Sequence, residues 1–341
     1  MSTTKARSRA TGRVTLADVA KLAQVSPITV SRALRGERSV DPELITRVKK
    51  AASRLGYTPD PAARALASRH SHHVAVLIPM LSNNLFVDVL ESIQKTLRQA
   101  GYQTLIGITH YDSAEEEQLL REQLQHRPAG ILVTGLDRSA AAQKLITQSG
   151  IPCVHMMEIA DSAKTNSVGF SQTQAAITLT EHLISRGRQR IAFAAAQLDP
   201  RTLQRLEGWK KTLKQHKLYD KALTYQNKSP SSMALGGEMF EHILNKDPKV
   251  DAIFFCNDDL AQGALMAAQR LNIKVPKQVA VAGFNDLTGS DLIGPGLTTI
   301  RTPRAAIGTA AADMLLSLMR HEKLSVAHVN VGYELVVRGS T

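Results

Sequence analysis

The stretch LAQVSPITVSRALRG, from Leu22 to Gly36, decides the fold of the N-terminal region. It places Pro27 between two apolar patterns that both repeat at helical spacing. A residue that precedes proline is pushed out of the α region, so a helix that begins near Thr15 cannot continue past Ser26. Serine is a preferred N-cap and proline suits the first helical position, so a second helix starts at Pro27. The stretch therefore predicts two short helices joined by a tight turn, a helix-turn-helix.

Apolar spacing extends this pattern into a three-helix unit over residues 14–59. Asp41 followed by Pro42 is a cap and a first helical position, and this pair opens a third helix. The faces that repeat at helical spacing predict a shared core of Leu16, Val19, Ala20, Ala23, Val30, Ala33, Leu34, Leu44, Ile45, Val48 and Leu55. A plain helical bundle would explain these faces. It would not explain Ile28 and Arg32, which are expected to point outward near the start of the second helix.

Positive charge is concentrated in the same region. Residues 1–73 hold 14 Lys and Arg against 5 Asp and Glu, so they carry +9 of the formal charge of +12. Such an asymmetry indicates a polyanionic partner such as nucleic acid, although a solubilising charged tail would give the same count. We expect residues 1–13 to form a basic flexible arm that adds salt-dependent, non-specific attraction to DNA.

The segment YTPDPAARALASRH, which begins at Tyr57, predicts a short helix opened by Asp60 and Pro61. A helix of about six residues is marginal in water. It carries Leu66 with little nearby to bury it. A hinge helix that orders only on binding, with Leu66 as a wedge in a DNA minor groove, fits these features. A simple interdomain linker over residues 60–73 is the alternative.

From residue 74 onward, apolar strand patterns alternate with helical patterns, as in proteins built on parallel sheets. The run VAVLIP at residues 74–79 is continuously apolar, which is typical of a strand covered on both faces. Two series of about five strands predict two similar lobes, with a ligand in the cleft at the carboxyl ends of the strands. Composition alone leaves a two-domain enzyme open.

Several other function classes lack their sequence signatures. No apolar run is long enough to span a membrane, and the N-terminus lacks the apolar segment of a secretory signal. Phosphate-binding glycine loops, zinc-ligand spacings and nucleophile elbows are also missing, so we expect no catalytic residues, no metal and no cofactor. We interpret the histidines of RHSHH at residues 69–73 as a solvated linker. Cys153 and Cys256 are interpreted as inert core thiols suited to a reducing cytoplasm.

The motifs VTLADVAKLAQVSPITVSRALRG and RVKKAASRLGYTPDPAARALAS, in this order, resemble the DNA-binding headpiece and hinge helix of the LacI/GalR family of bacterial transcription regulators. The resemblance implies an all-α helix-turn-helix headpiece plus hinge helix, followed by an α/β two-lobed periplasmic-binding-protein-like core. It places the second helix in the major groove, where Arg32 can pair with guanine and Ile28 offers only apolar contact. Asp60 stands where relatives usually carry Asn, so we assign it no DNA contact. The residues assigned to DNA contact are Thr15, Ser26, Pro27, Ile28, Thr29, Ser31, Arg32, Arg35, Tyr57, Ala63 and Leu66.

The resemblance also divides the effector-binding and dimerisation core, residues 74–341, into two lobes. The stretch LTTIRTPRAAIGTAAADMLL resembles the family's return crossover, so we place lobe one at about 74–169 and 299–325. Lobe two then covers about 170–298 and 326–341. The chain ends soon after GYELVVR, without leucine heptads that would form a tetramerising tail. We therefore expect a homodimer in the bacterial cytoplasm.

Six residues fall on the family's ligand positions: Phe86, Glu158, Phe170, Arg205, Asn257 and Asn285. Arg201, one turn before Arg205 on the same segment, is assigned to the effector with them. Sugar-responsive relatives usually carry Asp at the position of Asn285, and the exchange removes a negative charge and adds two donors. With Arg201 and Arg205 nearby, such a site would favour an anionic ligand with several hydroxyls. Glu158 argues against an anion unless it meets hydroxyls. A core position for Phe86 and a surface position for Arg201 stay open.

The stretches VHMMEIAD, VGFSQ and LDPRTLQR also resemble the branch of the family that responds to gluconate and 2-ketogluconate. The sequence as a whole therefore predicts a DNA-binding transcription regulator, a repressor of sugar-acid catabolism genes that a sugar-acid effector releases from operator DNA. Two headpieces of a dimer would bind a roughly palindromic double-stranded operator. The alternatives are a neutral sugar or nucleoside effector, a sugar-binding protein without DNA binding, and a sugar-processing enzyme.

Overall fold

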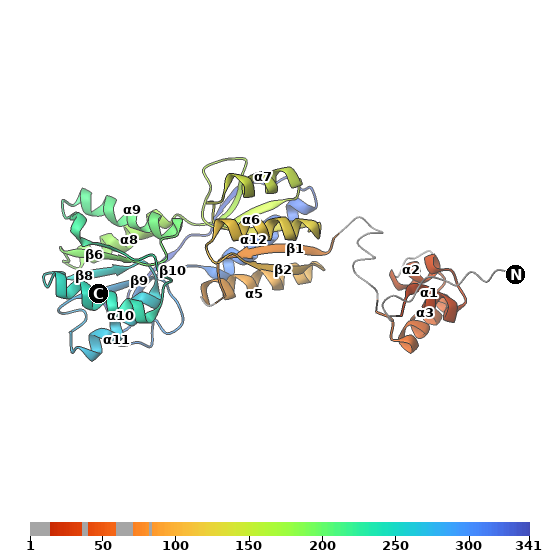
Figure 1. Ribbon diagram of the computed structural model, residues 1–341, viewed down its shortest axis with the longest axis horizontal. Coiled ribbons are helices and arrows are strands. Elements are labelled where there is room, and N and C mark those ends of the chain that lie inside the picture. The colour runs from red at the N-terminus through yellow and green to blue at the C-terminus, as the bar shows by residue number, and fades with distance from the viewer. Residues whose placement is uncertain (1–13, 36–39, 59–70, 82–83) are drawn as a thin grey trace. The chain divides into compact units, whose positions relative to one another are not determined.

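The computed structural model describes residues 14–35, 40–58, 71–81 and 84–341 (Figure 1). The chain divides into two compact units, residues 1–70 and 71–341, and each unit has its own apolar core. The expected basic arm and most of the expected hinge segment lie outside the described residues. Among the helices that the structure describes, none is long and apolar enough to cross a membrane.

The N-terminal unit contains the predicted helix-turn-helix and the third helix. Its helices are α1 (Leu16–Ala23), α2 (Pro27–Arg35) and α3 (Pro42–Leu55). Thr15 and Asp18 form a capping box at α1, because each accepts a hydrogen bond from the backbone N–H of the other. Helix α1 ends where Gln24 adopts a left-handed backbone with φ of 55°. The hydroxyl of Ser26 then caps α2 by accepting a hydrogen bond from Thr29 N at 3.1 Å.

Small apolar side chains fill the core of this unit, which lets three short helices pack closely. The fully buried members are Val19, Ala20, Ala23, Val30, Ala33, Val48, Ala51 and Ala52. Leu44, which was expected among them, is only half-buried and lies outside this cluster. The outer side of α2 is different, since Ile28 is 66% exposed there.

The first lobe of the C-terminal unit is built on a six-stranded parallel sheet in the order β11-β5-β4-β3-β1-β2. Helices α5 and α12 pack together on one face, and α6 and α7 cover the other (Figure 1). Alternate residues of β1 join the two resulting cores, as the pleat requires. The elements are β1 (His73–Ile78), α5 (Asn84–Gln99), β2 (Gln103–Ile108), α6 (Ser113–Gln125), β3 (Gly130–Thr134), α7 (Ala140–Ser149), β4 (Cys153–Met157), β5 (Asn166–Gly169), α12 (Arg304–Met319) and β11 (His328–Asn330).

The second lobe repeats this plan with a sheet in the order β12-β10-β9-β8-β6-β7, in which only the β10–β12 pair is antiparallel. Helices α8 and α9 cover one face and α10 and α11 the other (Figure 1). The elements are α8 (Gln172–Ser185), β6 (Ile191–Ala195), α9 (Pro200–Gln215), the 3-10 helix η1 (Lys221–Leu223), β7 (Thr224–Gln226), α10 (Met233–Lys246), β8 (Ala252–Phe255), α11 (Asp258–Arg270), β9 (Ala280–Asn285), β10 (Thr298–Arg301) and β12 (Glu334–Val336).

The chain passes between the lobes three times: after β5, after β10 and between β11 and β12. Two of these crossings differ from the expected boundaries. The expected second lobe included residues 326–341, yet β11 pairs with β5 in the first sheet. The expected first lobe began again at residue 299, yet β10 pairs with β9 in the second sheet through Arg301. Strands of three or four residues carry too little apolar periodicity to be assigned to a sheet from sequence.

Close packing of α10 against α11 supplies a stability test. A Cβ at Gly236 would lie 2.0 Å from the carbonyl oxygen of Leu260, whereas a Cβ at the adjacent Gly237 would make ordinary contacts at 3.4 Å or more. We expect Gly236→Ala to lower the free energy of unfolding by about 1–3 kcal/mol, because backbone must shift. Gly237→Ala should leave it unchanged or raise it by up to about 1 kcal/mol through helix propensity. Denaturant unfolding of both variants measures this difference, and equal effects would contradict the packing argument.

Candidate DNA-binding surface and effector pocket

The outward side of α2 gathers several of the residues assigned to DNA contact. Pro27, Ile28 and Arg32 are exposed, and Thr29 and Ser31 are half-buried beside them. The N-terminus of this helix also carries the positive end of the helix dipole, which favours phosphate. Helix α2 therefore carries an apolar side chain and a guanidinium on its exposed surface, and both kinds of group can contact base edges.

The other assigned residues have more structural surroundings. The hydroxyls of Thr15 and Ser26 cap helices, so their first role is to fix α1 and α2. Tyr57 is half-buried and packs against the core of the N-terminal unit. Arg35 is the last residue of α2, and its side chain lies outside the described part of the structure, as do Ala63 and Leu66.

A pocket opens between the two lobes at the carboxyl ends of strands from both sheets, where open α/β folds bind ligands. The first lobe contributes Met80, Asn84 and Tyr111. The second lobe contributes Gln197, Ser231, Met233, Asn257, Asp259, Gln262, Leu287 and Thr288. This lining combines apolar side chains with several hydrogen-bonding groups, the usual composition of a small-molecule site.

The backbone at the edge of this pocket adopts conformations that non-glycine residues rarely take. Tyr111 has φ of 59° just after β2, and Gln197 has φ of 65° just after β6. Asn285 and Asp286, at the end of β9, have φ of 113° and 52°. Left-handed backbone is unfavourable for residues with a Cβ, and it clusters at functional sites where the surroundings hold it in place. It recurs at three strand ends around this one pocket, which makes the pocket the candidate site.

Arg205, on α9, is the central cation behind the pocket wall, and it is only 3% exposed. Its Nε donates to Gln172 at 2.9 Å, and its Nη1 donates to the Cys256 carbonyl at 2.6 Å and to Asn257 Oδ1 at 2.9 Å. Its guanidinium carbon lies 3.8 Å from the centroid of the Phe284 ring. Within the described part of the chain, no carboxylate is at ion-pair distance and Nη2 donates no hydrogen bond. Burial of the guanidinium lowers the pKa of Arg205, although the negative charge of nearby Asp199 acts in the opposite direction.

Asn257 and Asn285 connect this arginine to the end of β9. Asn285 Nδ2 donates to Asn257 Oδ1 at 3.3 Å, and its own Oδ1 accepts from Thr302 at 3.1 Å. Asn257 lines the pocket, whereas Asn285 is buried directly behind it. The structure therefore brings Arg205, Asn257 and Asn285 into one hydrogen-bonded chain.

Arg201 and Glu158 pair with each other, so they do not act as separate charges. Arg201 lies 3.0 Å from Asp199 and 3.6 Å from Glu158, with both carboxylates buried. Glu158 also accepts hydrogen bonds from Gln204 at 2.6 Å and from Leu136 N at 3.3 Å. Burial would lower the pKa of Arg201, but these neighbouring acids, Asp199 foremost, raise it above its usual value. The open question of a surface position for Arg201 is settled, because its side chain is buried, and neither it nor Glu158 lines the pocket.

The two phenylalanines assigned to the effector lie in the apolar core. Phe86, on α5, and Phe170, after β5, are each 1% exposed, and neither lines the pocket. Phe170 stacks against Phe284, with ring centroids 6.4 Å apart, and also contacts Tyr333. The aromatic layer beneath Arg205 therefore supports the pocket from behind.

Most polar residues of the pocket wall were not predicted from the sequence as effector-binding residues. They are Asn84, Tyr111, Gln197, Ser231, Asp259, Gln262 and Thr288. Burial raises the pKa of Tyr111 to about 12, so this residue offers a neutral phenol. A signal was available for Tyr111 and Gln197, because polar residues directly after a predicted strand lie at the ligand-binding edge of the sheet. Within the described residues, no cluster of three or more His, Cys, Asp or Glu side chains could hold a metal ion.

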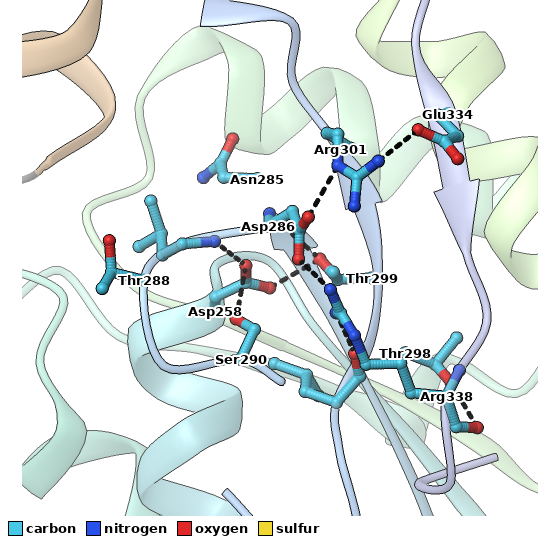
Figure 2. A network of polar contacts seen from close by, with 12 residues as sticks. Asp258, Asn285, Asp286, Thr288, Ser290, Thr298, Thr299, Arg301, Glu334 and Arg338 are labelled. Carbon is cyan, nitrogen blue, oxygen red and sulfur yellow. Dashed lines mark hydrogen bonds and ion pairs between the residues drawn. The ribbon is translucent and has the colours of Figure 1, made fainter. Parts of the chain in front are cut away.

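Asp258, the first residue of α11, fixes the loop that carries the pocket residues Leu287 and Thr288 (Figure 2). Its buried carboxylate accepts hydrogen bonds from Leu287 N at 2.6 Å, from Ser290 at 3.2 Å and from Thr299 at 2.6 Å. A Cβ on the neighbouring Gly283 would lie 2.2 Å from this carboxylate, so the strand must approach it without a side chain. The carboxylate thereby positions one wall of the pocket.

Burial raises the pKa of Asp258 from its ordinary value of 3.8 to about 6. The native state then holds the proton more tightly than the unfolded chain, so stability falls as the pH rises from about 4 to 6. We expect the free energy of unfolding of the wild type, measured relative to Asp258→Asn, to increase by about 1 kcal/mol when the pH is lowered from 7 to 5. Denaturant unfolding at the two pH values tests this, and a constant difference would show that Asp258 does not titrate in this range.

Two family models match the chain. Residues 15–60 match the model of bacterial regulatory proteins of the lacI family, and residues 180–341 match that of the periplasmic binding protein-like domain. The chain is 52% identical to the HTH-type transcriptional regulator GntR of Pseudomonas aeruginosa, over 100% of both chains. These matches cover both units of the structure.

Solved structures agree with this assignment. The crystal structure of the transcription regulator GntR from Chromobacterium violaceum is 45% identical with a TM-score of 0.77, over 79% of this chain and 98% of that one. The lac repressor dimer bound to operator is 25% identical with a TM-score of 0.85, over 96% of this chain and 99% of that one. The predicted headpiece and two-lobed core are thereby confirmed. The chain belongs to the LacI family of bacterial transcription regulators, and it is a DNA-binding regulator and not an enzyme.

Proposed function

We propose that this regulator is a homodimeric repressor in the bacterial cytoplasm. A sugar acid of the gluconate or 2-ketogluconate class binds to it and causes it to dissociate from operator DNA. The effector binds in the pocket between the lobes. Its carboxylate is directed toward Arg205, and its hydroxyls meet the amide and hydroxyl groups of the wall. Arg32 and Ile28 read base edges in the major groove, once in each half of the operator.

The main support for an anionic effector is that Arg205 is buried without a carboxylate partner among the described residues. Buried charges in proteins are normally paired, and a guanidinium matches a carboxylate through two parallel hydrogen bonds. Arg205 has donors left over and no carboxylate partner among the described residues, whereas Arg201 has two. An anion that reaches the pocket wall beside Asn257 would supply the missing charge. The similarity to GntR proteins supports the same effector class.

A neutral sugar or nucleoside is the second candidate, and one observation favours it. Asp259 lines the pocket and brings a carboxylate to the wall. Tyr111, Gln197 and Thr288 could bind hydroxyl groups of either class. The two candidates therefore differ in whether Arg205 contributes a charge to binding.

Exposed apolar side chains on the second lobe support a dimer. Leu292, in the loop before β10, is 82% exposed, and Met266, on α11, is 50% exposed. The hydrogen bond from Gln269 to the Gly294 carbonyl, at 3.1 Å, ties α11 to this loop. Apolar side chains on neighbouring elements offer a surface for a second copy of the chain. The structural match to a lac repressor dimer agrees with this proposal.

Calorimetric titration of the full-length protein with gluconate, 2-ketogluconate, glucose, ribose and adenosine tests the effector class. We expect saturable binding of a sugar acid and no comparable binding of the neutral compounds. An operator duplex, selected with the same protein from a random library, then tests release by fluorescence anisotropy. Binding of glucose, ribose or adenosine alone would overturn the sugar-acid assignment and leave the regulator class intact.

A further inference from the structure

One guanidinium joins the two lobes beside the effector pocket. Arg304 is the first residue of α12, which packs on the first sheet. Its Nη1 donates to the backbone carbonyls of Asn285 and Asp286 in the second lobe, each at 3.1 Å. Its Nε forms an ion pair of 2.6 Å with Asp88, on α5 of the first lobe. Arg304 thus connects the end of β9 with a first-lobe helix.

The first-lobe side of this connection is rigid. A Cβ at Gly308, one turn along α12 from Arg304, would lie 2.0 Å from the hydroxyl of Ser92 and 2.5 Å from the carbonyl of Val89 on α5. Helices that approach this closely cannot slide past each other without breaking contacts, so α5 and α12 are expected to move as one body. Asn84, the first residue of α5, itself lines the pocket.

The second-lobe side is equally constrained. The carboxylate of Asp286 is held by Arg301 at 2.7 Å and by Arg338 at 2.8 Å (Figure 2). Asn285 is held through its side chain by Asn257, which lines the pocket. Both residues have left-handed backbone, so their carbonyls point where ordinary strand geometry would not direct them. A ligand that reorients Asn257 and Asn285 would therefore move the two carbonyls that Arg304 holds.

We propose that Arg304 is the positioning residue that couples the effector pocket to the first lobe, and this inference rests on the proposed function. The first lobe is the one that the chain enters at β1, directly after the DNA-binding unit. A ligand at Asn257 shifts the positions of the backbone carbonyls at residues 285 and 286. Arg304 moves with these carbonyls, and its ion pair with Asp88 transmits the displacement to α5. Coupling of this kind is reciprocal, so bound operator DNA changes the affinity for the effector by the same factor as bound effector changes the affinity for operator.

The test compares Arg304→Met with Arg320→Met in the full-length protein. Arg320 is the C-cap residue at the other end of the same helix. Among the described residues its only ion pair is with Glu322, so its replacement controls for the loss of an arginine at an end of α12. Operator affinity is measured with and without saturating gluconate, and gluconate affinity is measured by calorimetry. The ratio of the two operator affinities is the coupling factor.

We expect the affinity of Arg304→Met for operator alone and for gluconate alone to lie within about threefold of the wild-type values. Its coupling factor should be at least roughly tenfold smaller than that of the wild type, and so close to one. Arg320→Met should keep the wild-type factor. Asp88→Asn, a partly exposed site that should tolerate change, is expected to reproduce the loss, and the double variant should lose no more than either single one. A purely structural role would weaken both affinities and leave their ratio unchanged.

A wild-type coupling factor in Arg304→Met or in Asp88→Asn would overturn the proposal while leaving the proposed function intact. If gluconate fails to change operator affinity in the wild type itself, the proposed function is what fails, and the coupling role of Arg304 falls with it. The wild-type titration separates these two results.

Discussion

Arg32→Ala is expected to abolish specific operator recognition while leaving the fold of the protein unchanged. The side chain lies exposed on the outer side of α2, so its removal opens no cavity. A bidentate arginine–guanine pair contributes roughly 1–3 kcal/mol of discrimination, and a dimer makes the contact in both half-sites. Specific affinity should therefore fall by roughly 30-fold to 20,000-fold, while non-specific affinity falls far less. Fluorescence anisotropy with the selected operator and with a scrambled duplex measures both.

Two variants separate base reading from simple charge. Arg32→Lys keeps the charge but loses the planar pair of donors, so it should recover non-specific affinity and not discrimination. Arg47→Ala removes an exposed charge of the same kind from α3, which is not expected to enter the groove. It should lower affinity for both duplexes by a similar small factor. Equal losses of discrimination in Arg32→Ala and Arg47→Ala would contradict the assignment of α2 as the reading helix.

Arg205→Met is expected to reduce gluconate affinity by about 100-fold, since it removes the only guanidinium behind the pocket wall that lacks a carboxylate partner in the described structure. Methionine has a similar length and no charge, so the aromatic layer beneath it keeps a packing partner. The loss should be much smaller for any neutral sugar that binds. Calorimetric titration with gluconate and glucose measures both effects.

The control for this variant lies on the same helix. Lys214→Met removes an exposed cation from the last turn of α9 and should leave gluconate affinity unchanged. Thermal unfolding followed by circular dichroism shows whether Arg205→Met keeps the core, because acceptors on Gln172, Cys256 and Asn257 each lose one donated hydrogen bond. Gluconate affinity within a few-fold of the wild type in a folded Arg205→Met protein would remove the main support for an anionic effector.

Local signals were sufficient for the N-terminal unit. Caps, a proline at a first helical position and apolar spacing act within a few residues, so they determine α1, α2 and α3 without help from distant parts of the chain. The continuous apolar runs of the core likewise predict buried parallel strands. Short strands behaved differently. β10 and β11 are assigned to their sheets only by hydrogen bonds to distant strands.

Residue types alone did not show which arginine near the pocket lacks a carboxylate partner. Arg201 and Arg205 lie one turn apart on α9 and look equivalent in sequence. Only the fold reveals that Arg201 faces Asp199 and Glu158 while Arg205 faces carbonyl and amide oxygens. The value of each cation for an anionic ligand depends on these neighbours, and several of them, such as Glu158, Cys256 and Asn257, lie more than forty residues away in the chain.

The sequence by itself therefore determined the helix-turn-helix and the parallel-sheet class of the core, because these depend on local propensity and on repeated apolar periods. The family was predicted from the resemblance of whole motifs, not from these patterns. The tertiary structure alone decided which polar residues line the pocket, which arginine lacks a partner and which residue joins the lobes. These properties depend on burial and on contacts across the sheet ends. Chain separation hides such contacts: Arg304 meets Asp88, more than two hundred residues away, only because two lobes fold around the same crossing segments.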